Sequence, residues 1–222
     1  MAEPRLRLLP ATPPMEHTSR MPRANALRWQ SEHDGAGVST AVEVFVTQKS
    51  YVRLCAHAGS DLDNEVGGVL AGKWRVDGAT GLRFVIVEGI LPAPHTRHGS
   101  TFVTFTQDSL VALNTQLEER YPGKQMVGWY HTHPRMGLFL SGYDAWLHEH
   151  FFPEAWQVAL VVDPWARQGG FFIRAQDGNL DPRRYVGFSE LVDARRRSVV
   201  HWDNLRVEQG AEVEEGRWKD EP

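Results

Sequence analysis

The sequence predicts a domain of the α/β class, of the α+β type, in which a mixed β-sheet is flanked by a few helices. Short aliphatic runs with the alternation of strands recur between residues 41 and 176, and segments with helical spacing lie between them. No internal repeat links these segments. Hydrophobic residues make up 41% of the 222 residues, which is enough to bury one substantial core.

The first half of the pattern predicts a strand, a helix and a hairpin. Residues 41–47 (AVEVFVT) alternate as a strand, and residues 48–59 have the spacing of an amphipathic helix. The apolar face of that helix is formed by Tyr51, Leu54, Cys55 and Ala58. Aliphatic runs at residues 65–76 and 82–91 are separated by DGATG, a turn signal that favours a β-hairpin.

The second half adds two helices among further strands. Residues 100–105 (STFVTF) predict a short strand, and Thr106 is a candidate N-cap for a helix that Pro122 and Gly123 end. The buried face of that helix is expected to hold Leu110, Leu113, Asn114 and Leu117. The remaining elements are a strand at 125–133, a short helix from about 141 to 151, and strands at 156–163 and 170–176.

Both ends of the chain differ from the middle in composition. We expect a flexible Pro/Arg-rich segment at residues 1–38, the folded domain at 39–200 and a charged tail at 201–222. The single cysteine, Cys55, excludes an intrachain disulfide, and neither a signal peptide nor a membrane-spanning stretch is evident, which favours a cytoplasmic protein. The formal net charge of -4 gives no reason to expect nucleic acid or a membrane surface as a partner.

The stretch GWYHTHPRMGLFLSGYD, residues 128–144, combines donors that suit a metal ion. In a strand, side chains at i and i+2 project from the same face, so His131 and His133 present two imidazoles to one point. A catalytic zinc ion usually takes three protein ligands and a water. Asp144, in the first turn of the following helix, supplies a third donor when the intervening loop returns the chain.

Each part of this motif also has a purely structural interpretation. Ser141 and Asp144 match the capping box that satisfies backbone amides at a helix start, and histidines in strands are often simply hydrogen-bonded. A helix start does not require two histidines on one face of the preceding strand, however. The combination therefore favours a metal site.

Hydrolysis at a zinc ion also requires a general base, usually a carboxylate that is close to the metal without binding it. Glu65 and Glu88 both stand in otherwise aliphatic strands, and either could instead face solvent at a strand edge. The residues by themselves do not distinguish the two.

Taken together, Glu65, His131-x-His133 and Ser141-x-x-Asp144 resemble the E…H-x-H-x(7)-S-x(2)-D signature of the JAMM (MPN+, JAB) zinc metalloproteases, and in particular the deubiquitinases. The resemblance covers roughly residues 41 to 190. It implies a mixed curved sheet of cytidine-deaminase-like architecture, with Zn²⁺ bound by His131, His133 and Asp144. It also implies that Glu65 is the general base and that Ser141 stabilises the oxyanion.

The resemblance further implies cleavage of the bond after the Gly-Gly tail of ubiquitin or a ubiquitin-like protein. The compact core looks more like a bacterial stand-alone member than a proteasome-lid subunit. A second zinc site of the Cys/His type is not expected with one cysteine. His148 and His150 are expected to be ordinary helix residues, and residues 93–101 either clamp the substrate tail or form a plain polar loop.

Two other functions stay open at this point. One is a non-catalytic MPN scaffold, although members of that class typically lack a ligand. The other is a related hydrolase that acts on sulfur-carrier or small-molecule adducts. The modifier, the linkage, the oligomeric state and any activating partner do not follow from the sequence.

Overall fold

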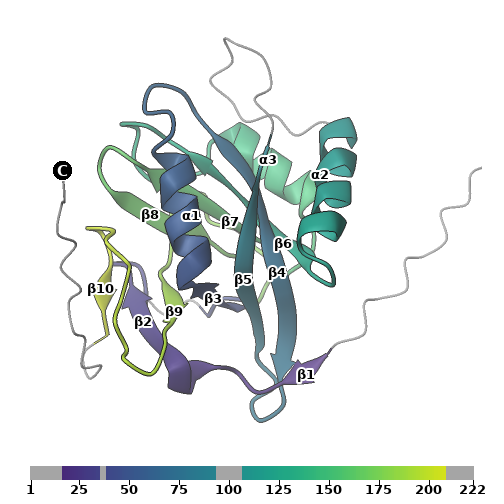
Figure 1. Ribbon diagram of the computed structural model, residues 1–222, viewed down its shortest axis with the longest axis vertical. Coiled ribbons are helices and arrows are strands. Elements are labelled where there is room, and N and C mark those ends of the chain that lie inside the picture. Colours follow the sequence, from purple (N-terminus) through teal and green to yellow (C-terminus); the bar gives the residue numbers. More distant parts are fainter. Residues whose placement is uncertain (1–16, 36–38, 94–106, 209–222) are drawn as a thin grey trace, which may run out of the picture.

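The computed structural model describes residues 17–35, 39–93 and 107–208. Within them, ten strands form one curved mixed sheet flanked by helices, which confirms the predicted fold class (Figure 1). The strands are β1 (Thr18–Ser19), β2 (Ala26–Gln30), β3 (Glu43–Thr47), β4 (Gly67–Asp77), β5 (Arg83–Pro92), β6 (Gln125–Thr132), β7 (Val158–Asp163), β8 (Gln168–Phe172), β9 (Phe188–Leu191) and β10 (Arg206–Val207). The helices are η1 (Arg23–Asn25), α1 (Gln48–Ala58), α2 (Gln107–Arg120) and α3 (Gly142–Phe151).

The sheet has the order β10-β2-β9-β3-β5-β4-β6-β7-β8, and β1 pairs with β4 outside this path. The sheet contains both parallel pairs, such as β6 with β7, and antiparallel pairs, such as β4 with β6. The register of β4 and β6 sets Gly67 opposite His131, so the start of β4 and the end of β6 lie side by side. The candidate metal ligands are therefore held at one end of the central strands.

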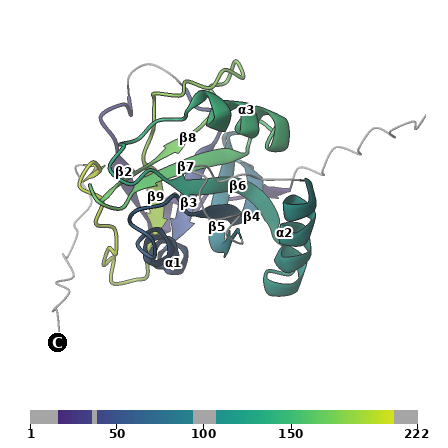
Figure 2. The same cartoon turned by 90° about the horizontal axis from the view of Figure 1, so that it is seen from above.

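Helices pack on both faces of the sheet (Figure 2). Helix α1 starts at the N-cap Thr47, whose Oγ1 accepts the backbone N–H of Ser50, and it buries Tyr51, Leu54 and Ala58 against one face. Helices α2 and α3 cover the opposite face, where Leu113, Leu117 and Leu147 join the apolar side chains of β4, β6 and β7. Burying these side chains supplies the main driving force for docking the helices.

The predicted elements within the described residues are confirmed, with small shifts at their ends. The hairpin of β4 and β5 is antiparallel and contains a bulge between Ala71 and Gly72. The prediction that Asn114 lies on the buried face of α2 is wrong, because this residue is exposed. The strand predicted at 100–105, the N-cap at Thr106 and most of the 93–101 loop lie outside the described residues.

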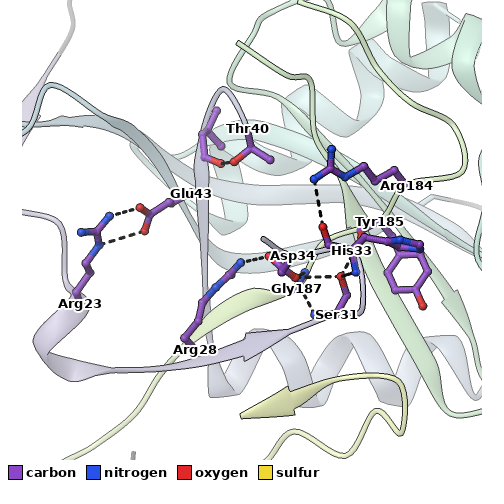
Figure 3. Close-up of polar contacts among 11 residues, drawn as sticks. Arg23, Arg28, Ser31, His33, Asp34, Thr40, Glu43, Arg184, Tyr185 and Gly187 are labelled. Carbon is purple, nitrogen blue, oxygen red and sulfur yellow. Dashed lines mark hydrogen bonds and ion pairs between the residues drawn. The ribbon is translucent and has the colours of Figure 1, made fainter. Parts of the chain in front are cut away.

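The predicted domain boundaries need correction, because the sheet continues on both sides of residues 39–200. Strand β2 pairs with β9 and β10, and its Leu27 is fully buried. Figure 3 shows how the turn after β2 is tied to the chain just before β9: the Asp34 carboxylate accepts the backbone N–H groups of Ser31 and Gly187, each at 2.7 Å, and pairs with Arg28.

The residues just after position 200 are likewise part of the folded structure. Trp202 and Leu205, in the segment expected to be a tail, are buried in the core cluster that also receives α1. Residues 17–35 and 201–208 therefore belong to the folded body. The structure also shows that none of the described helices combines the length and the apolar character that crossing a bilayer requires.

Candidate metal centre

The two histidines of the H-x-H pair stand at the end of β6. His131 is in the strand, and His133 follows it with its backbone N–H bonded to the carbonyl of Val162 in β7 at 2.9 Å. Both side chains point to the same side, as the period of a strand requires, and both are buried. Their Nε2 atoms are 3.0 Å apart. The strand therefore presents two imidazole nitrogens to one point.

Asp144, in the first turn of α3, completes this group. Its Oδ2 lies 3.5 Å from Nε2 of His131 and 3.8 Å from Nε2 of His133. In a tetrahedral zinc site with bonds of 2.0–2.1 Å, neighbouring ligand atoms are separated by roughly 3.3 Å. The observed spacings are near that value, so the three donors fit a metal ion without rearrangement of the backbone.

The protonation of these side chains also suits a cation. Burial, followed by the charge of His131, lowers the pKa of His133 to about 4, so its imidazole is neutral near pH 7. Burial opposes ionisation of Asp144, but the interactions with His131 and Ser141 outweigh it and lower the pKa of Asp144 to about 2. A neutral imidazole and a carboxylate are the forms that bind metals.

Ser141 and Asp144 also form a complete capping box. Ser141 Oγ accepts the backbone N–H of Asp144 at 3.1 Å, and Asp144 Oδ2 accepts the backbone N–H of Ser141 at 2.7 Å. Oδ2 is also the atom that faces the two imidazoles. The helix-cap and metal-site interpretations, which compete in the sequence, are therefore compatible in the structure.

The structure also distinguishes the two candidate glutamates. Glu65 lies just before β4, and its Oε1 is 3.9 Å from Nε2 of His133, with only 8% of its side chain exposed. Glu88 instead pairs with Lys124 at 2.6 Å. A pair of hydrogen bonds fixes the segment that carries Glu65, because Val66 donates to Oγ1 of Thr132 at 2.9 Å and accepts the N–H of Thr132 at 2.8 Å.

Asp163 organises the loop after His133, a role that the sequence analysis did not assign. Its buried carboxylate accepts four backbone N–H groups at 3.0–3.2 Å, which come from Arg135, Gly137, Trp165 and Ala166. This anchoring holds Arg135 in a left-handed conformation with φ of 63°. An aspartate before a proline at a strand end is the one signal that could have indicated it.

His148 lies outside the triad but supports it. The residue is fully buried, and its Nδ1 accepts the indole N–H of Trp129 at 3.1 Å. Burial, followed by the charge of Arg174, lowers the pKa of His148 to about 3, so the ring is neutral. The guanidinium of Arg174, a second group without a predicted role, donates to the carbonyl of Phe152 at the end of α3 at 2.9 Å. His150 is exposed.

Fold and site together define a mixed-sheet protein with a buried His-His-Asp triad that fits a metal ion. The family described as JAB1/Mov34/MPN/PAD-1 ubiquitin protease matches residues 39–153, which is about half of the chain, and the protein belongs to this family. The resemblance seen in the sequence is thereby confirmed.

Several curated proteins are similar to the chain. It is 29% identical over 132 residues to the 26S proteasome non-ATPase regulatory subunit 14 of Drosophila melanogaster, which covers 59% of this chain and 41% of that protein. It is 24% identical over 173 residues to the ubiquitin carboxyl-terminal hydrolase RPN11 of Saccharomyces cerevisiae, covering 73% and 55%. The chain thus spans about half the length of these two relatives or less.

A shorter match is to a protein named for a different activity. Over 63 residues the chain is 38% identical to the NAD(+) hydrolase TcpA of Theionarchaea archaeon, which covers 28% of this chain and 19% of that protein. A segment of that size does not carry over the activity of the whole protein.

Proposed function

We propose that the protein is a zinc-dependent isopeptidase or peptidase that hydrolyses the bond after the Gly-Gly tail of ubiquitin or a ubiquitin-like protein. One observation carries this proposal: Nε2 of His131, Nε2 of His133 and Oδ2 of Asp144 converge, with the Glu65 carboxylate beside them. Family membership and the similarity to a ubiquitin carboxyl-terminal hydrolase support the substrate class.

In this proposal His131, His133 and Asp144 hold Zn²⁺. When bound, the ion polarises the scissile carbonyl and lowers the pKa of a coordinated water. The triad brings one negative charge to a buried site, from Asp144, so the cation is stabilised by a carboxylate together with the ring nitrogens of two histidines.

Glu65 moves the proton. Its Oε1, 3.9 Å from Nε2 of His133, takes a proton from the attacking water and returns it to the leaving nitrogen, as a general base and then a general acid. Low exposure of the side chain keeps bulk water from competing for this step. Ser141 stabilises the oxyanion: its Oγ accepts from the N–H of Asp144, which leaves the hydroxyl proton available to donate.

The test is to measure zinc content and cleavage of a panel of ubiquitin, ubiquitin-like and sulfur-carrier C-terminal fusions. Wild type is compared with Glu65→Gln and with the matched control Glu88→Gln, which changes a glutamate that pairs with Lys124. We expect zinc in all three proteins and cleavage by wild type and the control alone. A loss of about 100-fold or more in kcat/KM is expected for Glu65→Gln.

The panel also distinguishes the alternatives. Zinc without any cleavage would favour a scaffold or an enzyme that needs a partner, and cleavage confined to sulfur-carrier fusions would favour the related hydrolase. A chain that retains no zinc would contradict the proposal, since the capping box alone would then explain Ser141 and Asp144.

A further inference from the structure

A cavity of about 610 Å³, separate from the metal triad, lies between α1, the end of β5 and the end of α2. Lys49 and Arg53 face it from α1, Ile90 and Pro92 from β5, and Arg120 from α2. Figures 1 and 2 show α1 and α2 on either side of β4 and β5. None of the lining residues belongs to the metal triad.

The cavity exists because β3 is shorter than β5. The parallel pairing of the two strands ends at Val46 and Val87, and the chain then turns from β3 into α1. The far end of β5, from residue 88 to Pro92, therefore has no strand beside it on that edge within the described residues. An open edge at the end of a central strand is unusual and leaves room for a ligand.

The wall on the α2 side is Tyr121. Its ring lies so close to Gly89 that a Cβ at that position would be 2.3 Å from Cε1 and Cζ of the tyrosine, so only glycine permits this packing. The hydroxyl of Tyr121 donates to the carbonyl of Ile90 at 3.2 Å and accepts from Nη1 of Arg53 at 3.2 Å. Both helices are thereby tied to the open edge, and the cavity has fixed walls.

The cavity is positively charged although the whole chain has a formal net charge of -4. Lys49, Arg53 and Arg120 are exposed around it. No carboxylate of the described residues pairs with Lys49 or Arg120, and the described hydrogen-bond partner of Arg53 is the hydroxyl of Tyr121. The nearby Glu88 is already paired with Lys124. Three cations therefore face solvent around a concave surface.

The cavity lies at the same end of the sheet as the metal triad. Pro92 of β5 is opposite Gly68 of β4, and the adjacent Gly67 is opposite His131 of β6. Strands are spaced by about 4.8 Å, so the two sites are separated by two strand widths, roughly 10 Å along the sheet. The cavity is therefore within reach of a protein whose tail is bound at the triad.

We propose that this cavity binds an acidic segment of the protein substrate, which rests on the function proposed above. Because the cations are exposed at the rim, a small ligand would not be enclosed as in an ordinary small-molecule pocket. Three cations on a chain of net charge -4 do not form the track of phosphate contacts that nucleic acid requires. Carboxylates on a protein surface match both the charge and the open shape.

The experiment uses the zinc-loaded full chain and a fluorescein-labelled hexaglutamate peptide, with binding followed by fluorescence anisotropy at low salt. Lys49→Glu/Arg120→Glu reverses two rim charges that form no hydrogen bond or ion pair with the described residues. The matched control, Arg183→Glu/Arg195→Glu, makes the same charge change at exposed arginines whose side chains contact no described partner. We expect binding to be about ten-fold weaker in the first variant than in the control.

A kinetic measurement then identifies the partner. The kcat/KM of Lys49→Glu/Arg120→Glu is compared with that of wild type on two substrates: a fusion protein that wild type cleaves, and a fluorogenic peptide of the last six residues of the same modifier. We expect the loss of kcat/KM on the fusion protein to be about ten-fold larger than the loss on the peptide. Equal hexaglutamate binding by both double variants would overturn the cavity as an anion site. Equal losses on fusion and short peptide would overturn the substrate as its occupant. If no panel member is cleaved, a scaffold or a partner-dependent enzyme is favoured over the function proposed above, while the anisotropy result still decides whether the cavity binds anions.

Discussion

Trp129 donates its indole N–H to Nδ1 of His148 across 3.1 Å, and the same indole stacks on the ring of His131 with centroids 4.6 Å apart. One side chain thus links α3, which carries Asp144, to the candidate ligand His131 on β6. The position of the triad depends on this buried contact as well as on the backbone.

Trp129→Phe is expected to destabilise the protein by about 1–3 kcal/mol, because the smaller phenyl ring fills less of the buried site and leaves Nδ1 of His148 without a donor. Urea unfolding of the metal-free protein measures the effect. Trp146→Phe is the matched control, since Trp146 is 46% exposed. Equal midpoints for the two variants would mean that the hydrogen bond contributes nothing.

Acid should weaken the metal-free fold between pH 7 and pH 5. The folded-state pKa of His148 is lowered to about 3 and that of His133 to about 4, while the pKa of histidine in the unfolded chain stays at its ordinary value of about 6.5. In this window the unfolded chain binds more protons than the native one, so stability falls as pH falls. Each histidine accounts for about 2 kcal/mol over this range.

The variant His148→Asn tests this assignment, because its amide oxygen can still accept from Trp129 while the group no longer titrates. Urea unfolding in the presence of a chelator at pH 7 and pH 5 should show a smaller loss for the variant, by about 2 kcal/mol. The same loss in both proteins would place the acid sensitivity elsewhere.

The two roles of the capping box can be separated by substitution. Asp144→Asn should lower zinc affinity by at least about 100-fold, because it removes the only anionic donor of the triad. Ser141→Ala should retain zinc and cost about 1 kcal/mol of stability through the lost cap. Zinc affinity is measured by chelator competition. Equal zinc loss in the two variants would contradict the assignment of Asp144 as the ligand.

Asp163→Asn should loosen the loop that follows His133. A neutral amide replaces a buried carboxylate that accepts four backbone N–H groups, so we expect a loss of about 2 kcal/mol. Asp203→Asn, at an aspartate that forms an exposed pair with Arg167, is the comparison and should cost little. A similar change in both would argue against a special role for the buried carboxylate.

The sequence predicts those parts of the fold whose signals are local. Tyr51, Leu54 and Ala58 recur with the helical period and are buried in α1. The capping box of Ser141 and Asp144 predicts the start of α3. The spacing of His131 and His133 predicts two imidazoles on one face, because alternation is a property of any strand. These features need no knowledge of distant residues.

Features that depend on distant partners were missed. Strand β2 is short and is held by pairing with β9, more than 150 residues away, and by the buried turn around Asp34. Asp163 and Arg174 form hydrogen bonds with backbone groups. Because every residue carries such groups, the sequence does not indicate which residues are the partners. The proline after Asp163 is a local hint of its role, but only the folded chain identifies the backbone groups that the two residues bind.

The placement of β2 between β9 and β10 has a practical consequence for work with fragments. A piece cut at residues 38 and 200 would keep the metal triad but lose β2 and β10. Strand β9 would then present unpaired backbone groups along one edge. Such an edge readily pairs with another copy of the chain. Loss of activity in that piece would therefore be explained first by aggregation through β9, and not by a defect in catalysis.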